Sequence, residues 1–117
     1  TLPSTLPVTS LVQQASRVLE LRNVVTENEL NDDDEYMEVV EDTEEEARRF
    51  GTLKKILVPR PGPENEPTVK GVGRVFLVFE KQEDAERAFA FMNGRKFEDR
   101  RVVAAYLPED KFNSEDY

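Results

Sequence analysis

The feature that most constrains the fold of this chain is the order in which two hydrophobic periods follow one another. Some segments alternate apolar and polar residues with a period of two, as half-buried strands do. Others carry apolar residues at spacings of three and four, as amphipathic helices do. Strands are predicted at 18–25, 53–58, 74–79 and 101–106, and helices from Asp33 or Asp34 to about Phe50-Gly51 and through 85–92, ending at Gly94.

This order, strand, helix, strand, strand, helix, strand, predicts an α+β fold. In the split β-α-β arrangement, a four-stranded antiparallel sheet is backed by two helices, which gives a β-α-β-β-α-β sandwich. We assign residues 17–107 to this domain. Residues 1–16 contain two prolines, several Ser and Thr and no sustained period, so they are expected to form a flexible linker. Residues 108–117 are a polar tail that could form a short helix.

The first predicted helix combines an apolar stripe with a ladder of acids. The stripe recurs at spacings of four, three, four and three and consists of Tyr36, Val40, Thr43, Ala47 and Phe50. At one hundred degrees per residue, Val39 and Glu46 fall on one border of this stripe. Farther round the helix lie Glu35, Asp42 and Glu38. Such a helix suits a groove that takes an apolar anchor flanked by cations, although an acidic helix face can also be simply solvated.

The charge of the chain favours basic partners. The net charge is -9, and residues 26–47 contain twelve carboxylates and no Lys or Arg. Proteins that bind nucleic acids draw most of their affinity from Lys and Arg contacts to phosphates, so this face is expected to repel RNA and to attract basic peptides.

The residue inventory argues against catalysis and cofactors. The chain has no His and no Cys, which excludes thiol nucleophiles, Ser-His relays and the usual zinc ligands. The run from Asp32 to Glu35 lacks the glycine and the spacing of a calcium loop. We therefore expect no enzyme activity, no metal and no cofactor. No apolar run is long enough to span a membrane, and no membrane partner is expected.

Directly after the second helix the chain reads Arg95-Lys96-Phe97. A planar cation and an aromatic ring two residues apart on a short loop can clamp a flat partner side chain, and tryptophan is the residue that fits best. In the alternative interpretation this segment is a structural turn, in which Phe97 caps the core and Arg95 faces water.

The predicted fold resembles an RNA-recognition motif (RRM), but two of its three base-stacking positions lack rings. Glu20 occupies the first-strand position, and Arg74 and Phe76 occupy those of the third strand. At about 1 to 3 kcal/mol per stacked base, the loss of two rings would weaken RNA binding by orders of magnitude. Phe76 remains as a residual RNA-platform position and is expected to lie under the C-terminal tail.

An RRM-like fold with an acidic first helix and an Arg-X-Phe tripeptide resembles the U2AF homology motif (UHM). The similarity is greatest to the UHM type at the C-terminus of U2 snRNP auxiliary factor large subunits, and it runs from about residue 17 to 110. The segments that carry the resemblance are 30–36, 40–42, 58–61 and 94–97. Glu44 and Phe91 stand where less acidic and smaller residues are expected, and Phe91 should be exposed near the pocket.

The resemblance implies a protein interaction module of a nuclear pre-mRNA splicing factor, active in branch-site and 3' splice-site recognition. In such domains a tryptophan of a UHM ligand motif, a disordered segment rich in Lys and Arg, enters a pocket between the helices. The implied pocket residues are Arg95, Phe97, Glu46 and Val39, and the implied contacts to ligand cations are Glu38, Asp42, Glu45 and Glu35. The implied partners are the branch-point-binding protein and the large scaffold protein of the U2 snRNP branch-site subcomplex, and RNA contact is not expected.

Two alternative functions remain at this point. The sheet could retain weak binding of single-stranded RNA through Phe76, Arg22 and Arg74. The same groove could instead accept a neighbouring chain and make the domain a self-association module, which the absence of tryptophan disfavours.

Overall fold

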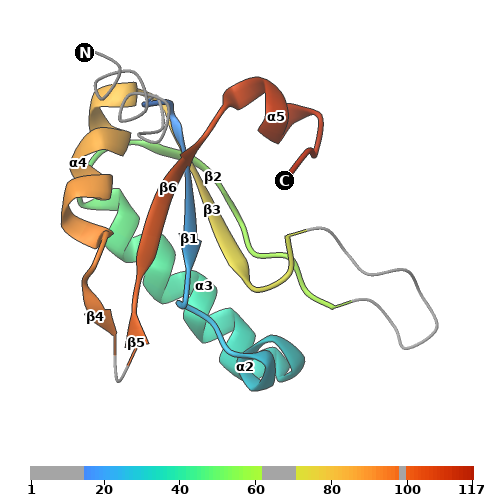
Figure 1. Ribbon diagram of the computed structural model, residues 1–117. Helices are drawn as coiled ribbons and strands as arrows, with labels where there is room; N and C mark the ends of the chain where they lie inside the picture. Colours follow the sequence, from blue (N-terminus) through green and yellow to red (C-terminus); the bar gives the residue numbers. More distant parts are fainter. Residues whose placement is uncertain (1–14, 62–70, 98–99) are drawn as a thin grey trace, which may run out of the picture.

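The fold is a four-stranded antiparallel sheet with helices against one face (Figure 1), as the sequence predicts. The computed structural model describes residues 15–61, 71–97 and 100–117. The sheet has the order β2-β3-β1-β6. Its strands are β1 (Val18–Arg22), β2 (Leu53–Leu57), β3 (Arg74–Phe79) and β6 (Val103–Leu107). The predicted strands at 18–25 and 53–58 are therefore shorter than expected, and Asn23 ends β1 with a φ of 68°.

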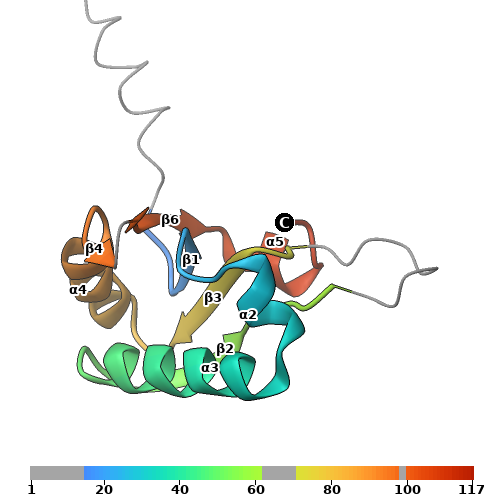
Figure 2. The same ribbon diagram turned by 90° about the horizontal axis from the view of Figure 1, so that it is seen from below.

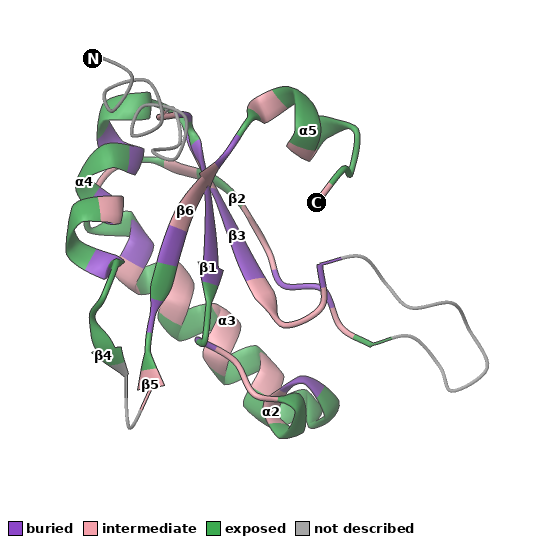
Figure 3. Ribbon diagram, in the orientation of Figure 1, coloured by how far each residue is buried: buried purple, intermediate pink, exposed green. Residues whose placement is uncertain are grey.

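The helices α3 (Asp33–Arg48) and α4 (Gln82–Met92) lie side by side beneath the sheet (Figure 2). Alternation along the strands explains this layer, because Leu19, Leu21, Val75, Leu77 and Phe79 all belong to the core between the sheet and the helices. Buried residues follow the central strands, and exposed residues cover the outer side of both helices (Figure 3).

A short helix that the sequence analysis did not predict, α2 (Glu27–Asn31), precedes α3. It starts with a capping box, in which Thr26 Oγ1 accepts from the Glu29 amide at 3.1 Å and Glu29 Oε1 accepts from the Thr26 amide at 2.8 Å. Asp32 then caps α3 by accepting from the Glu35 amide at 3.0 Å. The predicted start of α3 is thus confirmed. A five-residue helix is too short to show a hydrophobic period, and only its cap can reveal it.

The predicted strand 101–106 is wrong at its beginning. The Val102 side chain lies in the core, and the Val102 backbone bonds to Gly94 and Arg95 rather than to β1, with N···O distances of 2.7 and 2.9 Å. This interruption separates β6 from β5 (Arg100–Arg101), which pairs with β4 (Lys96–Phe97) in a small second sheet. Lys96 and Phe97 therefore belong to a strand and not to the short loop that was expected, because this hairpin supplies them with backbone partners.

The C-terminal tail covers the other face of the sheet, as expected for Phe76. Phe76 is fully buried, and its ring lies 5.9 Å from that of Phe112 and 4.5 Å from that of Tyr117. Phe112 belongs to α5 (Glu109–Asn113), which confirms the short terminal helix. The tail therefore occupies the surface on which an RNA base would stack.

An ion pair ties α5 to the start of β1. Arg17 Nε donates to Glu109 Oε2 at 2.9 Å, and Arg17 Nη2 donates to the other carboxylate oxygen. The hydrogen bond from Arg17 lowers the pKa of Glu109 below its ordinary value. The predicted linker 1–16 lies outside the described residues up to residue 14. Ser16, however, is buried and donates to the Leu107 carbonyl at 2.7 Å, so it already belongs to the folded unit.

Gly51 allows α3 and α4 to approach each other closely. An added Cβ would overlap the Asp84 side chain, including its Cβ, and the φ of +156° also disfavours larger residues. Gly51→Ala should therefore lower the free energy of unfolding by about 1–3 kcal/mol more than Gly73→Ala. Gly73 has a φ of +92° and open space around it, so it isolates the backbone cost of about 1 kcal/mol. Equal losses in denaturant titrations would contradict this close approach.

The ring cluster of the tail should contribute measurably to stability. Phe112→Ala removes a half-buried ring that packs on Phe76, so the free energy of unfolding should fall by about 1–3 kcal/mol. Asn113→Ala, an exposed change in the same helix, should alter it by less than about 0.5 kcal/mol. Unchanged stability of Phe112→Ala in urea unfolding would show that α5 is not docked on the sheet.

Candidate functional site

A cavity of about 350 Å³ opens between α3 and the segment that follows α4. This volume lies within the range of about 300 to 1,000 Å³ that is typical of ligand pockets. The described residues that line it are Leu21, Val24, Glu29, Glu38, Val39, Asp42, Thr43, Glu46, Met92, Arg95 and Val102. They come from β1, both N-terminal helices, α4 and the chain after α4, so only the folded structure brings them together.

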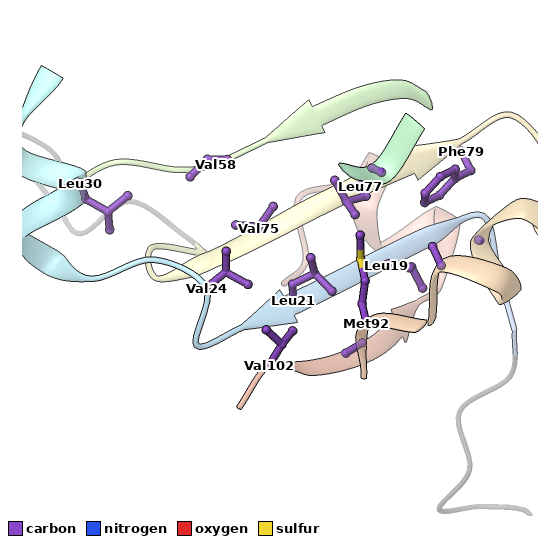
Figure 4. Close-up of a cluster of buried hydrophobic side chains, with 14 residues drawn as sticks. Leu19, Leu21, Val24, Leu30, Val58, Val75, Leu77, Phe79, Met92 and Val102 are labelled. Atoms are coloured by element: carbon purple, nitrogen blue, oxygen red, sulfur yellow. The ribbon is translucent and has the colours of Figure 1, made fainter. Parts of the chain in front are cut away.

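The floor of the cavity is the end of the hydrophobic core. Four buried residues form it, and Figure 4 shows them next to one another: Leu21, Val24, Met92 and Val102. Val39 and Thr43 add a half-buried wall from α3. Apolar surface that remains open to solvent in this way gains free energy when a large apolar side chain covers it.

Acids line one side of the cavity. Glu38, Asp42 and Glu46 are four residues apart along α3, so they form a row on one face of the helix. Within the described part of the chain, the carboxylates of Glu38 and Asp42 have no hydrogen bond or ion-pair partner. Their negative charge is therefore available to a cationic ligand.

Arg95 bridges the two helices at the rim. Its Nη1 donates to Glu46 Oε2 at 3.1 Å, and its guanidinium carbon lies 4.5 Å from the centre of the Phe91 ring. Phe91 contacts Phe50 in turn, with a ring separation of 5.2 Å. The expectation that Phe91 is exposed near the pocket is confirmed, since 46% of its surface is accessible.

The structure brings together five of the residues that the sequence pointed to, namely Val39, Glu46, Arg95, Glu38 and Asp42. Glu35 and Glu45 lie on α3 but do not line the cavity, because they are on other faces of the helix. Glu44 pairs with Arg48 at 2.8 Å. The backbone of Phe97 pairs with Arg100 in the β4–β5 hairpin, and its side chain lies outside the described part of the structure.

Several lining residues escaped the sequence analysis. Thr43 and Met92 were assigned to the core, and Val102 was assigned to the interior of a strand. Glu29 was not considered, although the Thr26-X-X-Glu29 pattern signals a capping box and hence a helix start. Leu21 and Val24 read as strand residues, and their sequence context does not show that a cavity exposes them.

A second cavity, of about 460 Å³, lies at the end of β1 and β3. Its lining includes Arg22 and Arg74, which are cross-strand neighbours. Both donate to the carboxylate of Glu20, at 2.9 and 2.8 Å, so one buried acid partly neutralises them. Phe76, the third member of the alternative RNA site, is buried on the same face and cannot stack on a base while the tail is docked.

In the described segments, no cluster of three or more His, Cys, Asp or Glu side chains is arranged to hold a metal ion. Nor does the described part of the molecule contain a helix that could cross a membrane.

Comparisons with known proteins agree with this fold. The family model of the RNA recognition motif matches residues 41–103. A solved structure, that of the N-terminal three RNA binding domains of the yeast splicing factor Prp24, superposes with a TM-score of 0.52 and 26% identity. The match covers 79% of this chain and 32% of that one.

Curated relatives are similar over most of the chain. A splicing factor U2af large subunit from Arabidopsis thaliana is 48% identical over 103 residues, which cover 88% of this chain and 18% of the relative. Its counterpart from Nicotiana plumbaginifolia is 44% identical, with the same coverage. The chain thus spans less than a fifth of the length of these relatives. It belongs to the RNA recognition motif family, and its sequence and fold are consistent with the U2AF homology motif found in the large subunits of U2AF.

Proposed function

We propose that this domain is a protein interaction module of a pre-mRNA splicing factor, which binds a basic peptide segment through a single tryptophan. The observation that carries the proposal is the cavity between α3 and α4, in which an apolar floor, an acidic wall and Arg95 meet. The proposal treats the domain as a binding protein without enzyme activity.

The shape and chemistry of the cavity support an aromatic anchor. A tryptophan buries about 150 to 250 Å² and prefers to keep its indole N–H near a polar partner. The apolar floor can take the ring, and the acids at the rim can accept a hydrogen bond. The guanidinium of Arg95 is planar and can stack on an indole face while Glu46 holds its edge at 3.1 Å. Phe97 is proposed to pack against the indole on the strength of the UHM resemblance.

The distribution of charge supports a cationic peptide. Glu38 and Asp42 are exposed beside the cavity, so Lys or Arg residues that precede the tryptophan can reach them. A negative potential at the mouth of the cavity speeds the approach of a basic segment and repels RNA. Glu35 and Glu45 do not line the cavity but can contact a longer ligand that extends along α3.

The names of the relatives support the cellular context. The curated relatives are splicing factors, and the structural neighbour belongs to a splicing factor as well. We therefore place this domain in the nucleus, in branch-site and 3' splice-site recognition. The proposed partners are the branch-point-binding protein and the large scaffold protein of the U2 snRNP branch-site subcomplex.

The first test is a titration of the domain into a peptide that carries several arginines before one tryptophan. The domain contains no tryptophan, so indole fluorescence reports on the peptide alone. A buried tryptophan is expected to contribute roughly 2 to 4 kcal/mol, so a Trp→Ala peptide should bind at least about 30-fold more weakly. Binding of a pyrimidine-rich RNA instead of the peptide would refute the proposal and favour the Arg22–Arg74 surface.

Removal of the stacking cation should weaken binding at the anchor. Arg95→Ala should reduce peptide affinity by about 10-fold or more, because it removes one wall of the proposed tryptophan site. Lys96→Ala makes the same charge change at the next residue, which is exposed and does not line the cavity, and should have little effect. Equal losses in isothermal titrations of the two variants would argue against a specific role for Arg95.

The acidic wall should act mainly through long-range attraction. Glu38→Lys should weaken binding by about 2- to 10-fold at low salt, because one rim pair contributes roughly 0.2 to 1 kcal/mol and reversal adds repulsion. The effect should shrink between about 0.01 and 1 M salt, where the screening length falls from about 30 to 3 Å. Glu41→Lys, on another face of α3, is the matched control. A loss that does not depend on salt would contradict this mechanism.

A further inference from the structure

Phe91 is an aromatic residue in the last turn of α4 that the proposed peptide site does not explain. Nearly half of its surface, 46%, is exposed, although a residue of this size is usually buried in a core. Its ring faces two groups, the ring of Phe50 at 5.2 Å and the guanidinium of Arg95 at 4.5 Å. The second contact connects it to the candidate site.

The contacts of Arg95 define where its guanidinium lies. The Arg95 amide donates to the Met92 carbonyl at 3.1 Å, and the Arg95 carbonyl accepts from the Val102 amide at 2.9 Å. The backbone is therefore anchored on both sides. The side chain is held at two further points, by Glu46 on α3 and by the ring of Phe91 on α4.

The two side-chain contacts use different parts of the guanidinium. Glu46 takes an N–H at its edge, whereas the Phe91 ring lies over the planar group. Arg95 lines the cavity and Phe91 does not, so the ring supports Arg95 from outside the cavity. This arrangement leaves Arg95 a surface toward the cavity, where a flat ligand ring can stack.

We propose that Phe91 is a positioning residue, which holds the Arg95 guanidinium at the rim before the ligand arrives. The inference rests on the proposed function, because it assumes that Arg95 contacts the peptide. An arginine with four rotatable bonds loses conformational entropy when it is fixed by a ligand. The Phe91 ring restricts the side chain in the free domain, so less is lost on binding. A cation–π contact at an exposed site corresponds to about a 2- to 5-fold change in affinity.

The binding test compares Phe91→Leu with Phe91→Tyr. Phe91→Leu keeps an apolar contact to Phe50 but removes the ring, and it should weaken binding of the arginine and tryptophan peptide by about 2- to 5-fold. Phe91→Tyr keeps the ring and should retain the affinity. Met37→Leu, at another exposed apolar residue of α3 outside the cavity, should also leave it unchanged.

A double-mutant cycle separates positioning from a general effect on structure. In an Arg95→Ala background, Phe91→Leu should no longer weaken binding, because the group that it positions is absent. The same loss in both backgrounds would overturn the proposal and would mean that Phe91 acts through the fold or touches the peptide itself. Thermal unfolding of each variant checks that the domain remains folded.

A measurement on the free domain does not depend on the peptide. The Arg95 side-chain proton resonances should be shifted by the ring current of Phe91, and they should return toward their ordinary positions in Phe91→Leu but not in Met37→Leu. Unchanged resonances in Phe91→Leu would overturn the proposal. If the native domain does not bind the peptide, the proposed function fails, and the Arg95 resonances still decide whether Phe91 holds Arg95.

Discussion

The central constraint on this structure is that the sheet must be covered on both faces. The first four residues of β1 are buried, and they point alternately to opposite sides. Leu19 and Leu21 face α3 and α4, whereas Val18 lies in a second cluster with Phe76 and the rings of the tail. A sheet buried in this way has no free aromatic platform at Phe76. Binding chemistry is therefore found at the edge of the helical layer, where the core reaches the surface.

The candidate site follows from the way in which the two helices end against the sheet. Because α3 and α4 do not close over the end of β1, the core residues Leu21, Met92 and Val102 form the floor of a cavity instead of a closed interior. The acids of α3 stand along one side, and Arg95 closes the rim by its ion pair with Glu46. The same helix thus supplies an apolar wall and a negative field, a combination that suits a basic segment with one aromatic anchor.

The fold was readable from the sequence because each element agrees with its local pattern. The apolar stripe of α3, its Asp32 cap and the alternation in β3 all predicted the observed elements. The errors lie where tertiary contacts override these patterns. Val102 reads as a strand residue, yet its bonds to Gly94 and Arg95 divide the strand, and α2 is too short to show a period. Glu35 and Glu45 read as members of one acidic ladder, although the helix turns them away from the cavity.

The sequence by itself determined the order of elements, the acidic character of α3, the loss of two base-stacking rings and the importance of Arg95. These properties depend on residue type and on local spacing, which the chain carries without folding. Only the tertiary structure decided that Leu21, Val24 and Glu29 share a cavity with α3, that the tail buries Phe76, and that Phe91 lies against Arg95. These contacts join residues from separate elements, and their geometry arises from how the helices, the tail and the sheet pack together.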